Sequence, residues 1–165
     1  MQSLARFLLI GAAGVALAAP AVSQRADDQI LPKSAELQRQ AREAIAAGKF
    51  EQAEDLLETA LAVDPRNRTA FVDIARVAGK QHLFGKAIRM TNKALLLEPN
   101  DPDAIAVQGE AMVEMGATAR AQANLQKLQT ICGAKGCPQL AQLSNAITHG
   151  PTVAAVKTPE SPKSN

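Results

Sequence analysis

The chain has 165 residues, a formal net charge of +2 and 47% hydrophobic residues, and its aromatic residues are four phenylalanines with no tyrosine or tryptophan. This length suggests a single domain. The good helix formers Ala, Leu, Gln, Glu, Lys and Arg are frequent and strand-like runs of Val, Ile and Thr are missing, so we expect an all-α fold. Charges of both signs are dispersed, which excludes the basic stripe of a nucleic-acid-binding domain and offers no particular affinity for an anionic membrane surface.

The N-terminus has the layout of a secretory signal peptide. A short, weakly positive segment is followed by the uncharged apolar run FLLIGAAGVALAA at 7–19 and then by small residues at Ala19, Ala21 and Ser23. The alternatives are an uncleaved anchor and a buried core helix, but the run is shorter than the roughly 20 residues that span a bilayer. We therefore predict a signal peptide at 1–21, a leader at 22–33, a periplasmic or secreted location, and no integral membrane segment after cleavage. No cysteine near the cleavage region could carry a lipid anchor.

The next segment repeats itself at a spacing of 34 residues, without insertion from Ser34 to Gly133. Small residues, turn residues and helix-ending residues recur in register. The aligned sets are Ala41, Ala75 and Gly109; Gly48, His82 and Gly116; Ala53, Ala87 and Ala121; and Pro65, Pro99 and Gly133. Since one helical hairpin cannot bury its own apolar face, such units stack into a continuous core.

This pattern resembles the tetratricopeptide repeat (TPR) family, whose period is 34 residues. The resemblance implies a right-handed α-solenoid of three helix-turn-helix repeats at 34–67, 68–101 and 102–135. The third repeat departs from the family pattern, with Gly109 at a position of small residues and Gly133 in place of the proline. The bulky aromatic residues that are frequent early in the first helix of each repeat are also reduced, to Leu37, Phe71 and Ile105.

Six helices are expected from the repeat, at 34–47, 50–63, 68–80, 84–97, 102–115 and 118–131. Gly48 can adopt the left-handed conformation that ends a helix, and His82 replaces it in the second repeat as a tolerated turn residue. Pro102 begins a helix at its first position, with Asp101 as the expected N-cap.

Beyond the third repeat, a last helix at 138–149 carries Leu140, Leu143 and Ile147 on one face. We expect this helix to cap the third repeat and the Pro-, Ser- and Lys-rich residues 150–165 to form a disordered tail. Cys132 and Cys137 flank a short Gly-rich turn, and in an exported protein such a pair predicts a disulfide in the first place. Free thiols, redox catalysis and metal binding are the alternatives, although four residues intervene and no further ligands have metal-site spacing.

The resemblance implies that a partner protein or peptide binds the concave face formed by the first helix of each repeat. Five positions in each repeat point to that face in the family. The predicted binding residues are Gln38, Arg42, Ile45, Thr69, Val72, Arg76, Lys80, Asp103, Glu110, Val113 and Glu114. Arg42, Arg76 and Glu110 would make the groove basic at one end and acidic at the other and so orient an extended ligand, unless they are ordinary solvated side chains. The Lys and Asn groups with which chaperone-binding repeats grip a terminal carboxylate are absent.

These observations lead to one principal hypothesis and two rivals. The first is an exported adaptor that binds a protein or peptide. The rivals are a structural module of a cell-envelope assembly that self-associates through its uncapped first repeat, and a thiol-redox protein that uses Cys132 and Cys137. We predict no enzyme, cofactor or metal site, because no phosphate loop or nucleophile arrangement stands out and the two histidines lie in a turn and near the terminus.

Overall fold

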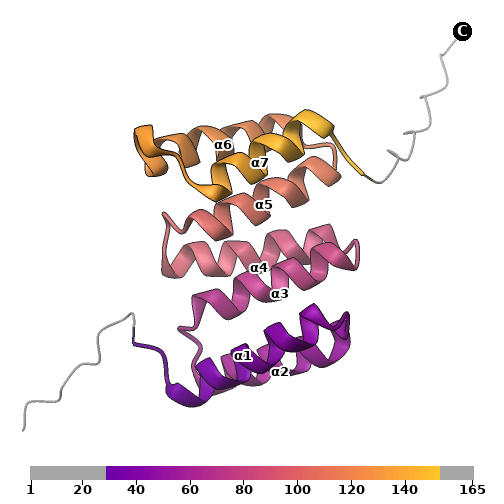
Figure 1. Cartoon of the computed structure of the whole chain (residues 1–165), viewed down its shortest axis with the longest axis vertical. Coiled ribbons are helices and arrows are strands. Elements are labelled where there is room, and N and C mark those ends of the chain that lie inside the picture. Colours follow the sequence, from indigo (N-terminus) through magenta and orange to yellow (C-terminus); the bar gives the residue numbers. More distant parts are fainter. Residues whose placement is uncertain (1–28, 153–165) are drawn as a thin grey trace, which may run out of the picture.

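The computed structural model describes residues 29–152, so the predictions for the signal peptide, for leader residues 22–28 and for tail residues 153–165 lie outside it. The described residues form only helices and connecting turns (Figure 1). In chain order these are α1 (Pro32–Ala46), α2 (Phe50–Val63), α3 (Arg68–Lys80), α4 (Phe84–Leu97), α5 (Pro102–Glu114), α6 (Thr118–Cys132), the short 3-10 helix η1 (Gly133–Lys135) and α7 (Pro138–His149). The predicted all-α stack of helical hairpins with a capping helix is confirmed.

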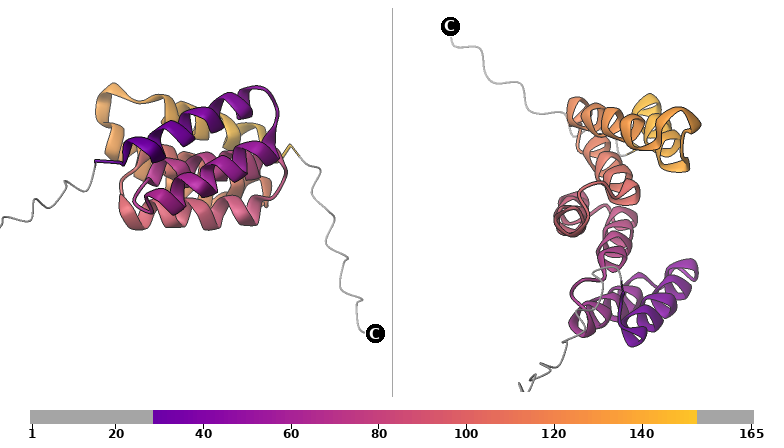
Figure 2. Two further views of the ribbon diagram at one scale, coloured as in Figure 1. Left: turned by 90° about the horizontal axis from the view of Figure 1, so that it is seen from below. Right: turned by 90° about the vertical axis from the view of Figure 1, so that its left-hand side faces the viewer.

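The helices form two rows. Each of α1, α3 and α5 pairs with the helix that follows it, and α7 packs on both α5 and α6. Within the described residues α1 approaches α3, α3 approaches α5 and α5 approaches α7, whereas α2, α4 and α6 make no close backbone approach to one another. The stack is curved, with α1 and α7 projecting to one side at its two ends and α3 and α5 recessed between them (Figure 2, right). We call the side formed by α1, α3, α5 and α7 the inner face.

Small side chains hold the paired helices together. Ala41 and Ala53 are fully buried where α1 meets α2, and Ala75 and Ala87 are fully buried where α3 meets α4. A methyl group at each of these points lets the two backbones approach closely. Larger residues then fill the remaining space, Leu57 between the first two hairpins and Leu128 between the third hairpin and α7.

The turn of the second repeat has the same backbone conformation as its neighbours, although a histidine replaces the glycine. Gly48 and Gly116 have φ angles of 71° and 75°, and His82 takes the same left-handed conformation with φ of 59°. A side chain in this region normally carries a conformational cost, which glycine avoids. The expected N-cap is present between α4 and α5, where the Asp101 carboxylate accepts a hydrogen bond of 2.9 Å from the amide of Ala104.

The capping helix explains the glycine of the third repeat. Leu143 of α7 is fully buried, and a Cβ atom added to Gly109 would lie 2.6 and 2.7 Å from its two methyl carbons. The methyl group of an alanine like Ala41 or Ala75 would therefore overlap the side chain of Leu143 at this position. Within 29–152, none of the helices combines the length and apolar character that a membrane crossing requires.

Candidate partner-binding surface

The inner face brings together eight of the eleven predicted residues as solvent-accessible side chains. Arg42 and Lys80 are exposed, and six others are partly exposed: Ile45, Thr69, Arg76, Asp103, Glu110 and Glu114. The remaining three, Gln38, Val72 and Val113, are buried.

The burial of Gln38, Val72 and Val113 does not fit the expectation that their side chains line a ligand site. Val72 is fully buried in the core between α3, α4 and α5, and Val113 packs with Met112 and Ala121. The reason at the first position is its place in the repeat, since the equivalent Gln38 and Ala106 are also buried. In this stack that position faces the neighbouring hairpin and is not directed at solvent.

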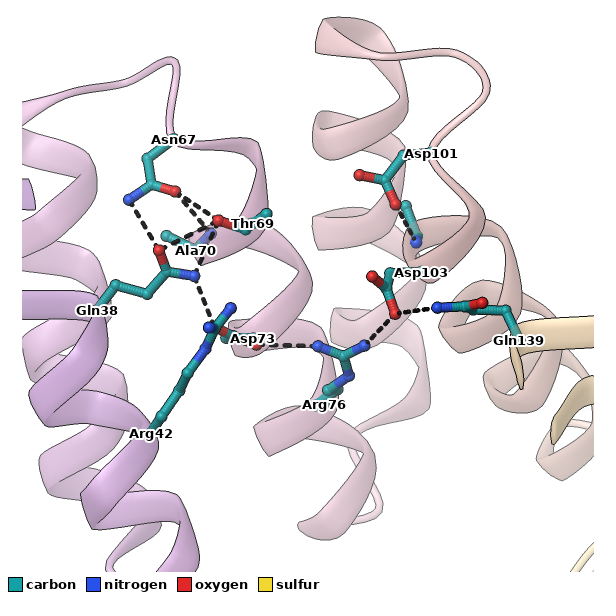
Figure 3. Close-up of polar contacts among 11 residues, drawn as sticks. Gln38, Arg42, Asn67, Thr69, Ala70, Asp73, Arg76, Asp101, Asp103 and Gln139 are labelled. Carbon is teal, nitrogen blue, oxygen red and sulfur yellow. Dashed lines mark hydrogen bonds and ion pairs between the residues drawn. The ribbon is translucent and has the colours of Figure 1, made fainter. Parts of the chain in front are cut away.

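Asp73 is the centre of a polar row that crosses the inner face (Figure 3). Its carboxylate, only 3% exposed, accepts hydrogen bonds from Gln38 Nε2 at 2.7 Å, Arg42 Nε at 2.7 Å and Arg76 at 3.0 Å. The first two donors lie on α1 and the third on α3 itself. A carboxylate with several donors from two helices fixes their relative positions as well as stabilising the charge.

The row continues across α5 to the capping helix. Arg76 donates a second hydrogen bond of 2.7 Å to Asp103 of α5, and Gln139 of α7 donates one of 3.2 Å to the same carboxylate oxygen (Figure 3). The inner face therefore extends over four helices, and the cap belongs to it. Gln139 could not be found from the repeat pattern because α7 was predicted only as a cover for the third repeat.

A second set of buried polar side chains fixes the start of α3. The side-chain oxygen of Asn67 caps the helix at the amide of Ala70 at 3.1 Å, and its nitrogen donates to Ser34 Oγ at 2.9 Å and Gln38 Oε1 at 3.3 Å. Thr69 completes the set with a hydroxyl 2.9 Å from Gln38 Nε2. Every group in it finds a partner, which is the condition for burying polar atoms without a penalty.

The two arginines of this face are paired with carboxylates of the protein itself. The expectation of a basic end built from Arg42 and Arg76 overlooked Asp73, which lies between them and pairs with both. Asp73 follows Thr69 by four residues and precedes Arg76 by three, so all three share one helical face, and this spacing is the signal that could have revealed it. Further along, Glu114 accepts hydrogen bonds of 2.9 and 2.8 Å from the amide and hydroxyl of Thr152.

Cys132 and Cys137 are joined by a disulfide bond that closes over η1. Cys132 is the last residue of α6 and Cys137 directly precedes α7, so the bond ties the end of the third hairpin to the start of the cap. Both cysteines of the chain are used in it, and neither is a free thiol.

Comparisons with known proteins agree with this architecture. The tetratricopeptide repeat family matches residues 44–110, and no curated protein matches the chain by sequence. The TPR domain of Sgt2 from Aspergillus fumigatus has a TM-score of 0.66 and 21% identity and covers 82% of this chain and 89% of its own. The second TPR domain of human RPAP3, in complex with an HSP70 peptide, has a TM-score of 0.61 and 20% identity and covers 69% and 94%.

A similar stack occurs in the Yersinia enterocolitica type III secretion chaperone SycD, which was solved with a peptide of the translocator YopD. Its TM-score is 0.61 at 18% identity, and the match covers 70% of this chain and 86% of that one. Likeness at such identities establishes the fold, and the family match adds the sequence of the repeats themselves. Residues 44–110 thus match the tetratricopeptide repeat family, and the stack of helices is similar in fold to known TPR domains.

Proposed function

We propose that this chain is an exported adaptor that binds a segment of a partner protein along its inner face. The observation that best supports this proposal is the hydrogen bonding and exposure of Arg42. Its Nε atom is fixed by Asp73 at 2.7 Å, while the side chain remains 56% exposed and its two terminal nitrogens have no acceptor among residues 29–152. A guanidinium held at one nitrogen and open at the others offers a pre-oriented donor pair to a backbone carbonyl or a carboxylate.

The neighbours of Arg42 on the same face of α1 are small or apolar. Ala35 and Ala46 are exposed on the same helix, and Ile45 is half-buried beside them. The row from Gln38 to Gln139 holds α1, α3, α5 and α7 in fixed relation, so a ligand that spans them meets a surface that is already ordered. Pre-organisation of this kind lowers the entropy that binding must overcome.

Two of the similar structures support a peptide ligand, since the RPAP3 domain is bound to an HSP70 peptide and SycD to a peptide of YopD. In this chain the positions of a carboxylate-gripping site hold Gln38, Arg42, Val72 and Arg76, without asparagine, and Val72 is buried. We therefore propose an internal protein segment as the ligand and not a chaperone C-terminus.

Export and the disulfide support each other in this proposal. The sequence at 1–21 has the layout of a secretory signal, and a Cys132–Cys137 bond persists in oxidising compartments such as the periplasm or the extracellular space. The placement of the bond between α6 and α7 favours a structural staple over redox catalysis.

The outer surface of α1 provides evidence against the rival hypothesis, which is that the chain self-associates. Arg39 on that surface pairs with Glu36 and Glu43, both of them exposed or partly exposed. A stacking interface would bury these charges, which favours the adaptor over end-to-end assembly. Light scattering of the full chain at high concentration separates the two, because only the rival predicts a mass that grows with concentration.

Arg39 and Arg42 offer a matched pair of variants for testing the inner face. Both are exposed arginines on α1 that pair with carboxylates, but Arg39 lies on the outer surface. We expect Arg42→Ala to weaken capture of a partner at least fivefold in affinity pull-downs quantified by mass spectrometry, while Arg39→Ala has no effect. Equal capture by both variants would mean that the inner face is not the binding surface.

A further inference from the structure

A shallow depression occurs twice along the edge formed by the turns within the hairpins. The first lies between the turn after α1 and the turn after α3, with Lys49, Phe50 and Gln81 among its lining residues. The second lies one repeat further on, between the turn after α3 and the turn after α5, and is lined by Leu83, Phe84 and Met115 among others. Six of the seven residues that line the second depression are equivalent, by the 34-residue period, to the six that line the first, so the chain holds two copies of one backbone shape.

The chemistry of the two copies is opposite. Phe50 and Phe84 are equivalent, but Lys49 of the first depression corresponds to Leu83 of the second, and Gln81 corresponds to Met115. Leu83 is 48% exposed and Met115 is 58% exposed. The first copy shows that the fold accommodates polar residues at both positions, so packing does not explain why the second copy is apolar and open to solvent.

His82 is a third departure at the same place. It occupies a left-handed position with φ of 59° where the equivalent Gly48 and Gly116 have φ of 71° and 75°. Its ring packs edge-on against Phe84 with centroids 5.8 Å apart. A side chain kept in a conformation that favours glycine points to a role beyond forming the turn, and here the side chain forms a wall of the second depression.

The charge at the second depression also differs from that at the first, which is lined by both Lys49 and Glu51. Arg89 lines the second depression, whereas the equivalent position in the first repeat is Asp55. Lys86, the other cation of the depression, is paired with Glu54 of α2. No carboxylate among residues 29–152 pairs with Arg89, which leaves one guanidinium beside an apolar surface.

We propose that this second depression is a docking site, distinct from the inner face, for an acidic protein segment that carries a large apolar side chain. The apolar side chain packs on Leu83, Phe84 and Met115. A neighbouring Asp or Glu of the segment accepts hydrogen bonds from Arg89. Met115 suits such a role because its unbranched, polarizable side chain adapts to varied partners.

The methionines provide the readout for a test. A library of random dodecapeptides displayed on phage is selected against the full chain, and the enriched peptides are synthesised and titrated into chain labelled with 13C at its methionine methyl groups. We expect the enriched peptides to combine Leu, Ile, Phe or Met with neighbouring Asp or Glu. The signal of Met115 should shift on titration, while those of the buried Met112 and the partly buried Met90 should stay in place.

Variants that restore the first-repeat residues provide the second arm. Leu83→Lys, Met115→Gln and Arg89→Asp together should lower the affinity at least tenfold, and Arg89→Asp alone should abolish the preference for acidic peptides. Because the first repeat carries Lys49, Gln81 and Asp55 at the same positions, helicity by circular dichroism should be unchanged. The matched control is Lys49→Ala, which should leave the affinity as it is.

The proposal is overturned if no peptide is enriched, if the enriched peptides leave the Met115 signal in place, or if the triple variant binds them as tightly as the parent. A peptide that instead loses affinity through Arg42→Ala alone would belong to the inner face. That result would support the proposed function and contradict the second site, so the two proposals fail separately.

Discussion

Replacing Gly109 with alanine tests the docking of the capping helix, because the sign of its effect depends on one neighbour. In the interior of a helix, alanine is favoured over glycine by about 1 kcal/mol. At Gly109 the new methyl group would lie 2.6 Å from a methyl carbon of the fully buried Leu143, and overpacking of this kind costs about 1–3 kcal/mol. The two terms together predict a net loss of about 0–2 kcal/mol for Gly109→Ala.

The sign should reverse once Leu143 is shortened. Leu143→Ala alone should cost about 2–5 kcal/mol, since it removes a fully buried side chain. In that background the space above Gly109 is open, so Gly109→Ala should stabilise the protein by about 1 kcal/mol. The double-mutant cycle thus predicts a coupling energy of about 1–3 kcal/mol between the two positions.

Urea unfolding followed by circular dichroism measures all four free energies of unfolding. Gly79→Ala is the control, because Gly79 lies in α3 and a Cβ atom there would meet nothing within 4 Å. We expect this control to stabilise by up to about 1 kcal/mol in both backgrounds. If Gly109→Ala stabilises the parent as much as the Leu143→Ala variant, α7 does not pack on Gly109 as described.

Three further predictions concern single side chains. Asp73→Ala should lower the free energy of unfolding, measured by urea denaturation, by about 2–3 kcal/mol. This is less than the about 3–5 kcal/mol lost when a fully buried ion pair is broken, because the arginine partners of Asp73 reach solvent. Asp73→Asn should lower the free energy of unfolding by less than Asp73→Ala does. His82→Gly should raise the melting temperature, because it relieves about 1–2 kcal/mol of left-handed strain and loses only about 0.5–1 kcal/mol to the flexibility of glycine. Gly48→Ala should lower the melting temperature, because it introduces the same strain. The Asp64 carboxylate accepts a hydrogen bond of 2.9 Å from the amide of Leu31, which holds its pKa below the ordinary value. Its contribution to the free energy of unfolding is therefore complete at a pH above the ordinary pKa and is lost as the pH falls through the lowered pKa. The difference in unfolding free energy between the parent and Asp64→Asn should accordingly narrow below a pH of about 4, and a constant difference would contradict the assignment.

The fold was predictable because the repeat constrains it many times over. Helices α2, α3, α4 and α7 have the predicted bounds, and the others differ by one or two residues at one or both ends. The early start of α1 at Pro32 follows from the tolerance of proline for the first turn of a helix. Each boundary was marked in the sequence by a turn residue, a proline or an N-cap at a recurring position, so local chemistry sufficed.

The inner face was less predictable because it depends on how successive hairpins meet. Val72 was assigned to the surface from its position in the family pattern, but the stacking of α3 on α5 buries that position. The partners of Asp73 on α1 lie 31 and 35 residues away in sequence, and Gln139 lies 36 residues from Asp103. Contacts between residues about one period apart depend on the three-dimensional register, which a single repeat does not encode.

The unequal spacing of the two rows of helices has a mechanical consequence. Hydrogen bonds and ion pairs link the inner helices from α1 to α7, while α2, α4 and α6 make no close backbone approach to one another. Bending of the stack therefore changes the separation of the outer helices and leaves the inner arc nearly constant in length. A ligand that lies along the inner helices therefore contacts residues whose mutual distances stay nearly constant when the stack bends.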